Sequence, residues 1–141
     1  MISFSAGQSD GNITCPVPAD YTPCTCNDYG DGTIDLNCNV RILNDVRASR
    51  ILSAFLLTPG VSPVTALYLF SNQLTKIPGE IVHFNQLRYL SFGSNQITSV
   101  TSGAFNFSAT TVKSLWLYGN QLTSIDAGVL EGYKNKSVPI E

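Results

Sequence analysis

The sequence predicts an α/β solenoid, in which the short strands of successive turns stack into one parallel sheet. Three stretches fit the template L-x-L-x-x-N-x-L-x-x-I with apolar equivalents: residues 67–77, 90–100 and 115–125. All four cysteines lie ahead of these repeats, within residues 15–38. A repeated unit cannot bury its apolar face alone, so repeats stack and share a core. We therefore predict a short right-handed coil with a concave parallel sheet, a disulfide-stapled N-terminal cap and no evident cysteine-containing C-terminal cap.

The first half of each template predicts a strand, and the second half predicts a turn. Leu67 and Leu69 alternate with Tyr68, and a period of two places alternate side chains on opposite faces of a strand. An asparagine follows where the chain must bend, because its amide can satisfy backbone groups that a bend leaves unpaired. Stacked turns should then arrange these amides in a ladder of Asn72, Asn95 and Asn120.

Composition and pattern divide the 141 residues into four segments. These are a polar, flexible N-terminal segment (1–14), a cysteine cap with an irregular first repeat (15–63), three regular repeats (64–133) and a tail (134–141). In the first repeat, residues 47–57 place apolar side chains at helical spacing, which predicts a helix on the convex side. The step from Asn39 to Asn72 is 33 residues, longer than the later steps of 23 and 25, so this turn should be irregular.

The four cysteines predict disulfides in an oxidising compartment. Cys15, Cys24, Cys26 and Cys38 are even in number and clustered, as in a local disulfide module. A zinc site is the alternative, but zinc ligands usually come in C-x₂₋₄-C pairs rather than as one C-x-C with two distant single cysteines. Spacing alone leaves three connectivities open.

The spacing C-P-x₇-C-x-C-x₁₁-C ahead of the repeats resembles the N-terminal cap of extracellular leucine-rich-repeat proteins. The asparagine steps also lie within the range of about 20–29 residues of such repeats. The resemblance implies the pairs Cys15–Cys26 and Cys24–Cys38, in a cap that covers the apolar end of the first repeat. The stretches S-G-A-F and N-Q-L-T-S-I are similar to those of secreted arthropod leucine-rich-repeat proteins. Extracellular members usually end in a cysteine-bearing C-terminal cap, which the last residues here do not show.

Composition and short motifs favour an extracellular protein. Charged residues make up 13% and the net charge is −2, so there is no electrostatic case for binding nucleic acid or an anionic membrane. No apolar run reaches the roughly 20 residues of a transmembrane helix. Asn12, Asn106 and Asn135 each begin an N-glycosylation acceptor triplet. Together with the cysteines, these triplets predict a secreted glycoprotein.

The outward strand positions of the three repeats predict a partner-binding surface. They carry five aromatic side chains and no charge: Tyr68, Phe70, Tyr89, Trp116 and Tyr118. Aromatic residues are enriched at binding hot spots, and a contiguous exposed apolar patch usually marks an interaction site. Tyr68, Ser91 and Trp116 should form one row, and Phe70, Gly93 and Tyr118 another. The small central residue of each row should leave a shallow trough between two aromatic walls.

Two other interpretations of this strip stay open. The aromatic residues can stabilise the sheet as a cross-strand ladder instead of binding anything. Aromatic rings can also stack on sugars, but sugar sites usually add carboxylates and amides. The strip offers only the hydroxyl groups of Ser91, Ser94 and Ser114.

No pattern indicates catalysis, a cofactor or a metal site. His83 is the single histidine and falls on the convex side, the common nucleophile and phosphate-binding motifs are absent, and the carboxylates are scattered. Residues 27–32 are rich in Gly and Asp and predict a turn, whereas a calcium loop would need a closing acidic residue. We therefore expect a non-enzymatic module that binds a protein partner. The alternative is a structural extracellular protein that forms a homo-oligomer through its uncapped end.

Overall fold

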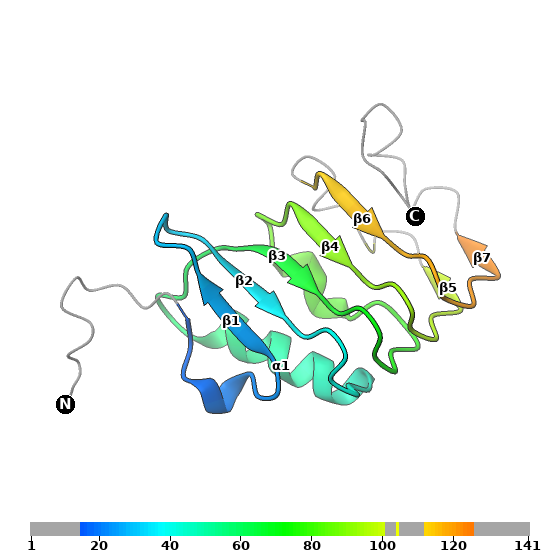
Figure 1. Ribbon diagram of the computed structural model, residues 1–141, viewed down its shortest axis with the longest axis horizontal. Coiled ribbons are helices and arrows are strands. Elements are labelled where there is room, and N and C mark those ends of the chain that lie inside the picture. The colour runs from blue at the N-terminus through cyan, green and yellow to red at the C-terminus, as the bar shows by residue number, and fades with distance from the viewer. Residues whose placement is uncertain (1–14, 101–103, 105–111, 126–141) are drawn as a thin grey trace.

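The computed structural model describes residues 15–100, 104 and 112–125 (Figure 1). Five strands form one sheet in the order β1 (Thr25–Asp28), β2 (Ile34–Asn37), β3 (Val64–Tyr68), β4 (Tyr89–Ser91) and β6 (Ser114–Trp116). Two shorter strands form a second sheet: β5 (Ser99–Val100) and β7 (Ser124–Ile125). The helical elements are η2 (Pro18–Asp20), α1 (Asp45–Leu57) and η3 (Gly79–His83).

Strands β2, β3, β4 and β6 are parallel, and each contributes one leucine to the same row of the core. The register pairs neighbouring members of the series Leu36, Leu67, Leu90 and Leu115, all of which are fully buried. Strand β1 pairs with β2 in the antiparallel sense and ends the sheet at the cap. The parallel stacking of equivalent leucines is consistent with the predicted solenoid.

Helix α1 packs its apolar side against the core on the inner face of the sheet (Figure 1). Its buried residues recur with helical periodicity: Ala48, Ile51, Leu52 and Phe55. The helix begins two residues earlier than predicted, at Asp45. It does so because the Asn44 side chain accepts a hydrogen bond from the Arg47 N–H at 2.9 Å and caps the first turn.

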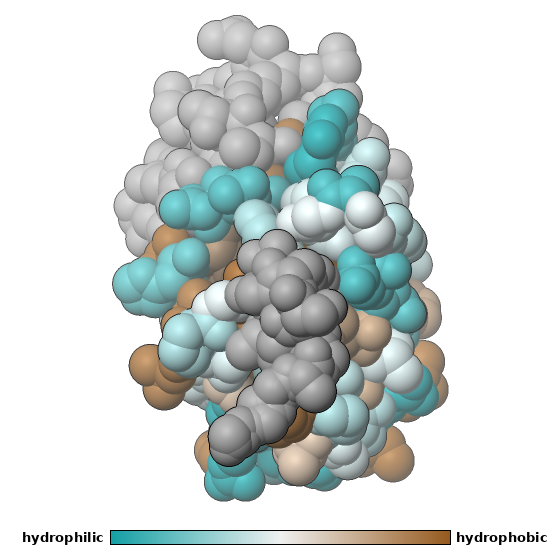
Figure 2. All heavy atoms as spheres, turned by 90° about the vertical axis from the view of Figure 1, so that its left-hand side faces the viewer, coloured by the Kyte–Doolittle hydropathy of each residue, from teal (hydrophilic) through white to brown (hydrophobic). Residues whose placement is uncertain are grey.

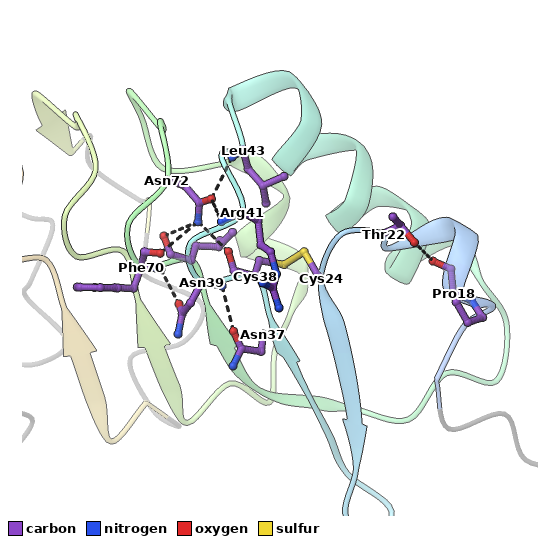
Figure 3. The surroundings of a disulfide bond; sticks show 11 residues. Pro18, Thr22, Cys24, Asn37, Cys38, Asn39, Arg41, Leu43, Phe70 and Asn72 are labelled. Carbon is purple, nitrogen blue, oxygen red and sulfur yellow. Dashed lines mark hydrogen bonds between the residues drawn. A yellow bond between two sulfur atoms is a disulfide. The ribbon is translucent and has the colours of Figure 1, made fainter.

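The cap contains both disulfides that the resemblance implied, Cys15–Cys26 and Cys24–Cys38. Cys24 and Cys38 are buried, so the second bridge joins the cap directly to the core (Figure 3). The ring centroids of Tyr21 and Phe55 lie 5.6 Å apart, which packs the cap against α1 as well. Seen from this end, the described surface mixes hydrophilic side chains with small apolar areas (Figure 2). These features fit a cover over the first turn of the coil.

Asparagine side chains join each turn of the coil to the one before it. Each Nδ2 donates to a carbonyl oxygen of the preceding turn, at 2.8 Å for Asn72 to Cys38, 2.9 Å for Asn95 to Leu69 and 2.9 Å for Asn120 to Phe92. Each Oδ1 accepts a main-chain N–H of that turn at 3.0 Å, from Leu43, Leu74 and Ile97 respectively. One amide therefore satisfies both a donor and an acceptor that the bend leaves unpaired.

The first turn carries Arg41, not Asn39, at the ladder position. The register of β2 and β3 sets Leu36 beside Leu67 and so brings Arg41 beside Asn72. Asn39 instead accepts the Phe70 N–H at 2.8 Å (Figure 3). The first repeat step therefore does not begin at Asn39 as predicted, because the cap strand β2 is itself the first strand of the coil. The template is hard to see there because a cysteine and an arginine replace its second leucine and its asparagine.

Several predicted features lie outside the described residues. They are the glycosylation acceptors Asn12, Asn106 and Asn135, the segment 1–14 and the tail 134–141. Among the residues that are described, no helix has both the length and the apolar character needed to cross a membrane. In the same ranges, no group of three or more His, Cys, Asp or Glu side chains is arranged to hold a metal ion.

Candidate functional site

The outward face of the sheet is built from two rows of strand residues and a third row just beyond them. Since the leucines of the core row point inward, the residues on either side of each leucine point outward. The first row contains Asp35, Ala66, Tyr89 and Ser114, and the second contains Asn37, Tyr68, Ser91 and Trp116. The third row follows the strands and contains Asn39, Phe70, Gly93 and Tyr118. We call these three rows the outward face.

The third row is held by main-chain hydrogen bonds that continue the parallel pairing. The Val40 N–H donates to Phe70 O at 2.9 Å, the Ser71 N–H to Gly93 O at 2.9 Å and the Ser94 N–H to Tyr118 O at 2.8 Å. The three donors have φ of 55°, 58° and 54°, and Gly119, at the same position of the last described turn, has φ of 73°. This shared left-handed residue turns the chain sharply in every turn, just before the ladder position.

The predicted trough over Gly93 is wrong, because two aromatic rings meet above this residue. The centroids of Phe70 and Tyr118 lie 6.0 Å apart with an interplanar angle of 45°. A Cβ atom on Gly93 would come within 3.2 Å of both rings. Ser91, the small residue of the second row, is also buried. The absence of a side chain on Gly93 thus lets the rings of Phe70 and Tyr118, from the turns on either side, meet above it.

All five predicted partner-binding side chains lie on this face, but solvent reaches them unequally. Tyr118 is 48% exposed and Tyr89 is 38% exposed. Tyr68, Phe70 and Trp116 are partly buried by their neighbours. The most accessible rings therefore stand on the second and third of the three regular repeats.

Strand β2 and the residues just after it add three polar side chains that were not predicted for this face: Asp35, Asn37 and Asn39. Asp35 and Asn37 lie in residues 33–38, which the sequence pattern assigns to the cap strand, and Asn39 lies in the irregular first repeat. The alternation of Ile34 and Leu36 with Asp35 and Asn37 carried the signal, since it predicts polar side chains opposite the core. The face therefore includes a carboxylate and two amides beside its aromatic rings.

Asp35 is held by the cap hairpin, and no cation in the described part of the chain pairs with it. Its Oδ1 accepts a hydrogen bond from Asn27 Nδ2 at 2.7 Å, and its Oδ2 accepts one from the Tyr29 hydroxyl. The bond to the carboxylate, followed by desolvation and by nearby negative charge, raises the pKa of Tyr29 to about 12. The pKa of Tyr68 is also raised, by burial first and then by the charges of Asp35 and Tyr89. The carboxylate of Asp35 therefore contributes to the raised pKa of both Tyr29 and Tyr68.

Three hollows of the described surface are lined by residues of α1, η3 and the segments beside them, and not by the three rows of the outward face. A hollow of about 430 Å³ is lined by Ser53, Leu56, Leu57, Glu80 and His83. His83 is exposed there and has no nucleophile or carboxylate hydrogen-bonded to it in the described part of the chain. This arrangement has none of the paired groups that general acid–base or nucleophilic catalysis requires.

Comparison with known proteins gives a weak similarity to leucine-rich-repeat proteins. No protein-family model matches the chain. The chain is 28% identical over 127 residues to leucine-rich repeat-containing protein 3B of Bos taurus, Mus musculus and Homo sapiens. The match covers 89% of this chain and 45% of each relative, so the chain spans less than half the length of the curated relatives it matches. This similarity and the asparagine ladder both support a leucine-rich-repeat protein.

Proposed function

We propose that this protein is a secreted leucine-rich-repeat module that binds a protein partner through the outward face, the predicted concave side of the coil. The observation that supports this most is the presence of aromatic side chains at outward positions of three successive turns, with Tyr89 and Tyr118 exposed to solvent. Tyrosine and tryptophan combine large apolar area with a polar atom, and such residues dominate binding hot spots. The disulfide-stapled cap suits an oxidising, extracellular environment.

The alternative role, a ladder that only stabilises the sheet, explains part of the arrangement. Phe70 and Tyr118 contact each other, as a stabilising pair would. It does not explain why Tyr89 and Tyr118 remain open to solvent, since a purely structural aromatic residue gains most when it is buried. Binding and stability are therefore measured separately in the experiment that tests the proposal.

The test uses a double variant, Tyr89→Ala with Tyr118→Ala, and a matched control, Leu57→Ala with Val82→Ala. The control removes two exposed apolar side chains from the α1 side. Extracellular proteins retained by the immobilised wild-type chain are identified, and their affinity for each variant is measured by surface plasmon resonance. We expect the aromatic variant to bind at least about tenfold more weakly, as for the loss of a hot spot. The control should bind as the wild type does.

Thermal unfolding of the same variants separates the two roles of the rings. A double variant that unfolds earlier but binds with unchanged affinity would show that the face is a structural ladder. Equal losses of affinity in the aromatic variant and the control would place the binding surface elsewhere.

A further inference from the structure

The outward face has a single ionisable carboxylate, and it lies at the capped end. Asp35 is only 4% exposed, yet its two hydrogen-bond donors, the Asn27 amide and the Tyr29 hydroxyl, are both neutral. Within residues 15–100, 104 and 112–125, no lysine or arginine forms an ion pair with it. A carboxylate removed from water is normally paired with a cation, because its desolvation is expensive otherwise. This side chain thus has a charge that the described fold does not balance.

One tyrosine contacts this carboxylate, and two more stand on the neighbouring strands of the same face. Ala66 stands between Asp35 and Tyr89 in the first row. Tyr68 follows on the same face of β3, and both Asp35 and Tyr89 lie near enough to raise its pKa. Tyr29 reaches over from the cap hairpin to the carboxylate. We call Tyr29, Asp35, Tyr68 and Tyr89 the acidic corner.

The chemistry of the acidic corner selects a flat cation. Tyrosine ring faces attract positive charge, and a carboxylate pairs with a guanidinium through two parallel hydrogen bonds. A guanidinium is also less strongly hydrated than an ammonium and stacks on aromatic rings, which suits a mostly buried carboxylate. An anion would meet the uncompensated charge of Asp35, and a neutral group would leave that charge unbalanced.

We infer that the acidic corner binds an arginine side chain of the protein partner, whose guanidinium replaces the Tyr29 hydroxyl on Asp35. The inference rests on the proposed function, because the partner supplies the arginine. Tyr29 can give way because it is 61% exposed and precedes Gly30 in the turn of the cap hairpin. Asn27 keeps its bond to Oδ1, so the carboxylate stays oriented while Oδ2 is exchanged. Tyr68 and Tyr89 then offer their rings to the guanidinium.

If a guanidinium replaces the Tyr29 hydroxyl on Asp35, substitutions of the donor, Tyr29, and of the acceptor, Asp35, should have opposite effects on binding. Tyr29→Phe keeps the ring but removes the competing hydroxyl, so a guanidinium should bind several-fold more tightly. Asp35→Asn removes the charge, and binding should weaken about tenfold or disappear, as expected for the loss of a charge-assisted hydrogen bond. Asp20→Asn changes the net charge equally at an exposed position in η2 and should leave binding unchanged.

The experiment titrates the full chain with n-butylguanidinium chloride and, as a neutral probe of the same shape, n-butylurea, at constant ionic strength. Aromatic ¹H–¹³C NMR signals of the three tyrosines of the corner report binding. We expect saturable shifts with the guanidinium only. Similar shifts with both probes, unchanged binding in Asp35→Asn or weaker binding in Tyr29→Phe would overturn the inference. Because Tyr29→Phe is a gain of affinity, it cannot be imitated by a variant that fails to fold.

Trp116→Ala distinguishes failure of this inference from failure of the proposed function. Trp116 belongs to the outward face but not to the acidic corner, so its loss should leave guanidinium binding intact. If partner binding depends on Trp116 while no guanidinium binds at Asp35, the proposed function stands and the arginine site does not. If the guanidinium binds but partner affinity is unchanged in both Trp116→Ala and the Tyr89 and Tyr118 double variant, the aromatic face fails as the partner site and the arginine site loses its ligand.

Discussion

Asn95 Nδ2 donates a hydrogen bond to the Leu69 carbonyl oxygen of the preceding turn at 2.9 Å. The same amide donates to Phe92 O and Gly93 O within its own turn, and its Oδ1 accepts the Leu74 N–H. Both residues of the Asn95–Leu69 pair are buried. One side chain therefore replaces the water that would otherwise satisfy several main-chain groups at the bend.

Asn95→Ala should be among the most destabilising substitutions in the coil. It leaves a buried N–H and buried carbonyl oxygens without their partner, and each such group costs about 1–3 kcal/mol. We expect the free energy of unfolding to fall by about 3 kcal/mol, measured by urea denaturation followed through Trp116 fluorescence. Gln96→Ala, at the exposed neighbouring position, should change it by less than about 0.5 kcal/mol. Similar values for both variants would contradict the structural role of the ladder.

Val40→Gly should stabilise the protein. Val40 has φ of 55° at the left-handed position where the last described turn has Gly119, and its side chain is exposed. The left-handed conformation costs roughly 1–2 kcal/mol for a residue with a Cβ atom, and more for a β-branched one, whereas glycine adopts it freely. After subtracting the larger unfolded-state entropy of glycine, we expect a gain of about 1 kcal/mol in the free energy of unfolding.

The reverse substitution provides the control for this position. Gly119→Ala introduces a Cβ at φ of 73° and within 2.9 Å of Ser94 Oγ, so it should destabilise the protein. If Val40→Gly lowered the midpoint of denaturation as Gly119→Ala does, strain at this position would not be the governing effect.

The stability of the protein should depend on the ionisation of Tyr29 at high pH. Its pKa is about 12 in the folded protein and 10 without the fold, so folding favours the protonated phenol. This contribution is fully present below pH 10 and is lost as the pH rises from 10 through about 12. Spectrophotometric titration of the phenolate should show Asp35→Asn returning the pKa of Tyr29 toward 10, because the bond to Asp35 is the largest cause. Asp20→Asn should leave the titration unchanged, and an unaltered curve in Asp35→Asn would exclude the Tyr29–Asp35 bond.

Opening the Cys24–Cys38 bridge should loosen the cap. Replacing both cysteines by serine removes a cross-link across a sequence separation of 14 and places polar groups at buried positions. Loops of this size predict a loss of about 3 kcal/mol, to which the buried hydroxyl groups add. The Cys15→Ser with Cys26→Ser variant, whose cysteines are less buried, should lose less. Chemical denaturation under non-reducing conditions measures both, and the opposite order would show that Cys24–Cys38 is not the bridge that ties the cap to the core.

Much of the coil was predictable because its rules are local and repeated. The alternation around Leu67, Leu90 and Leu115 decides which side chains face the core, since the pleat of a strand admits only two directions. The asparagine of each turn follows from the chemistry of a bend, which needs a donor and an acceptor in one short side chain. These properties depend on neighbours in sequence, so three copies of one pattern were enough to indicate them.

The tertiary structure alone decided how the turns meet. The rings of Phe70 and Tyr118 meet over Gly93 because they are large and Gly93 has no side chain to keep them apart. The two rings belong to turns that are not adjacent in sequence. The alternation in residues 34–37 places Asp35 opposite the core, but the register of β2 against β3 was needed to show that it lies beside Ala66 on the outward face. The sequence by itself determined which side of each strand is apolar. The outer surface depends on which side chains of different turns lie side by side. That arrangement is fixed only when folding sets the distances between the turns.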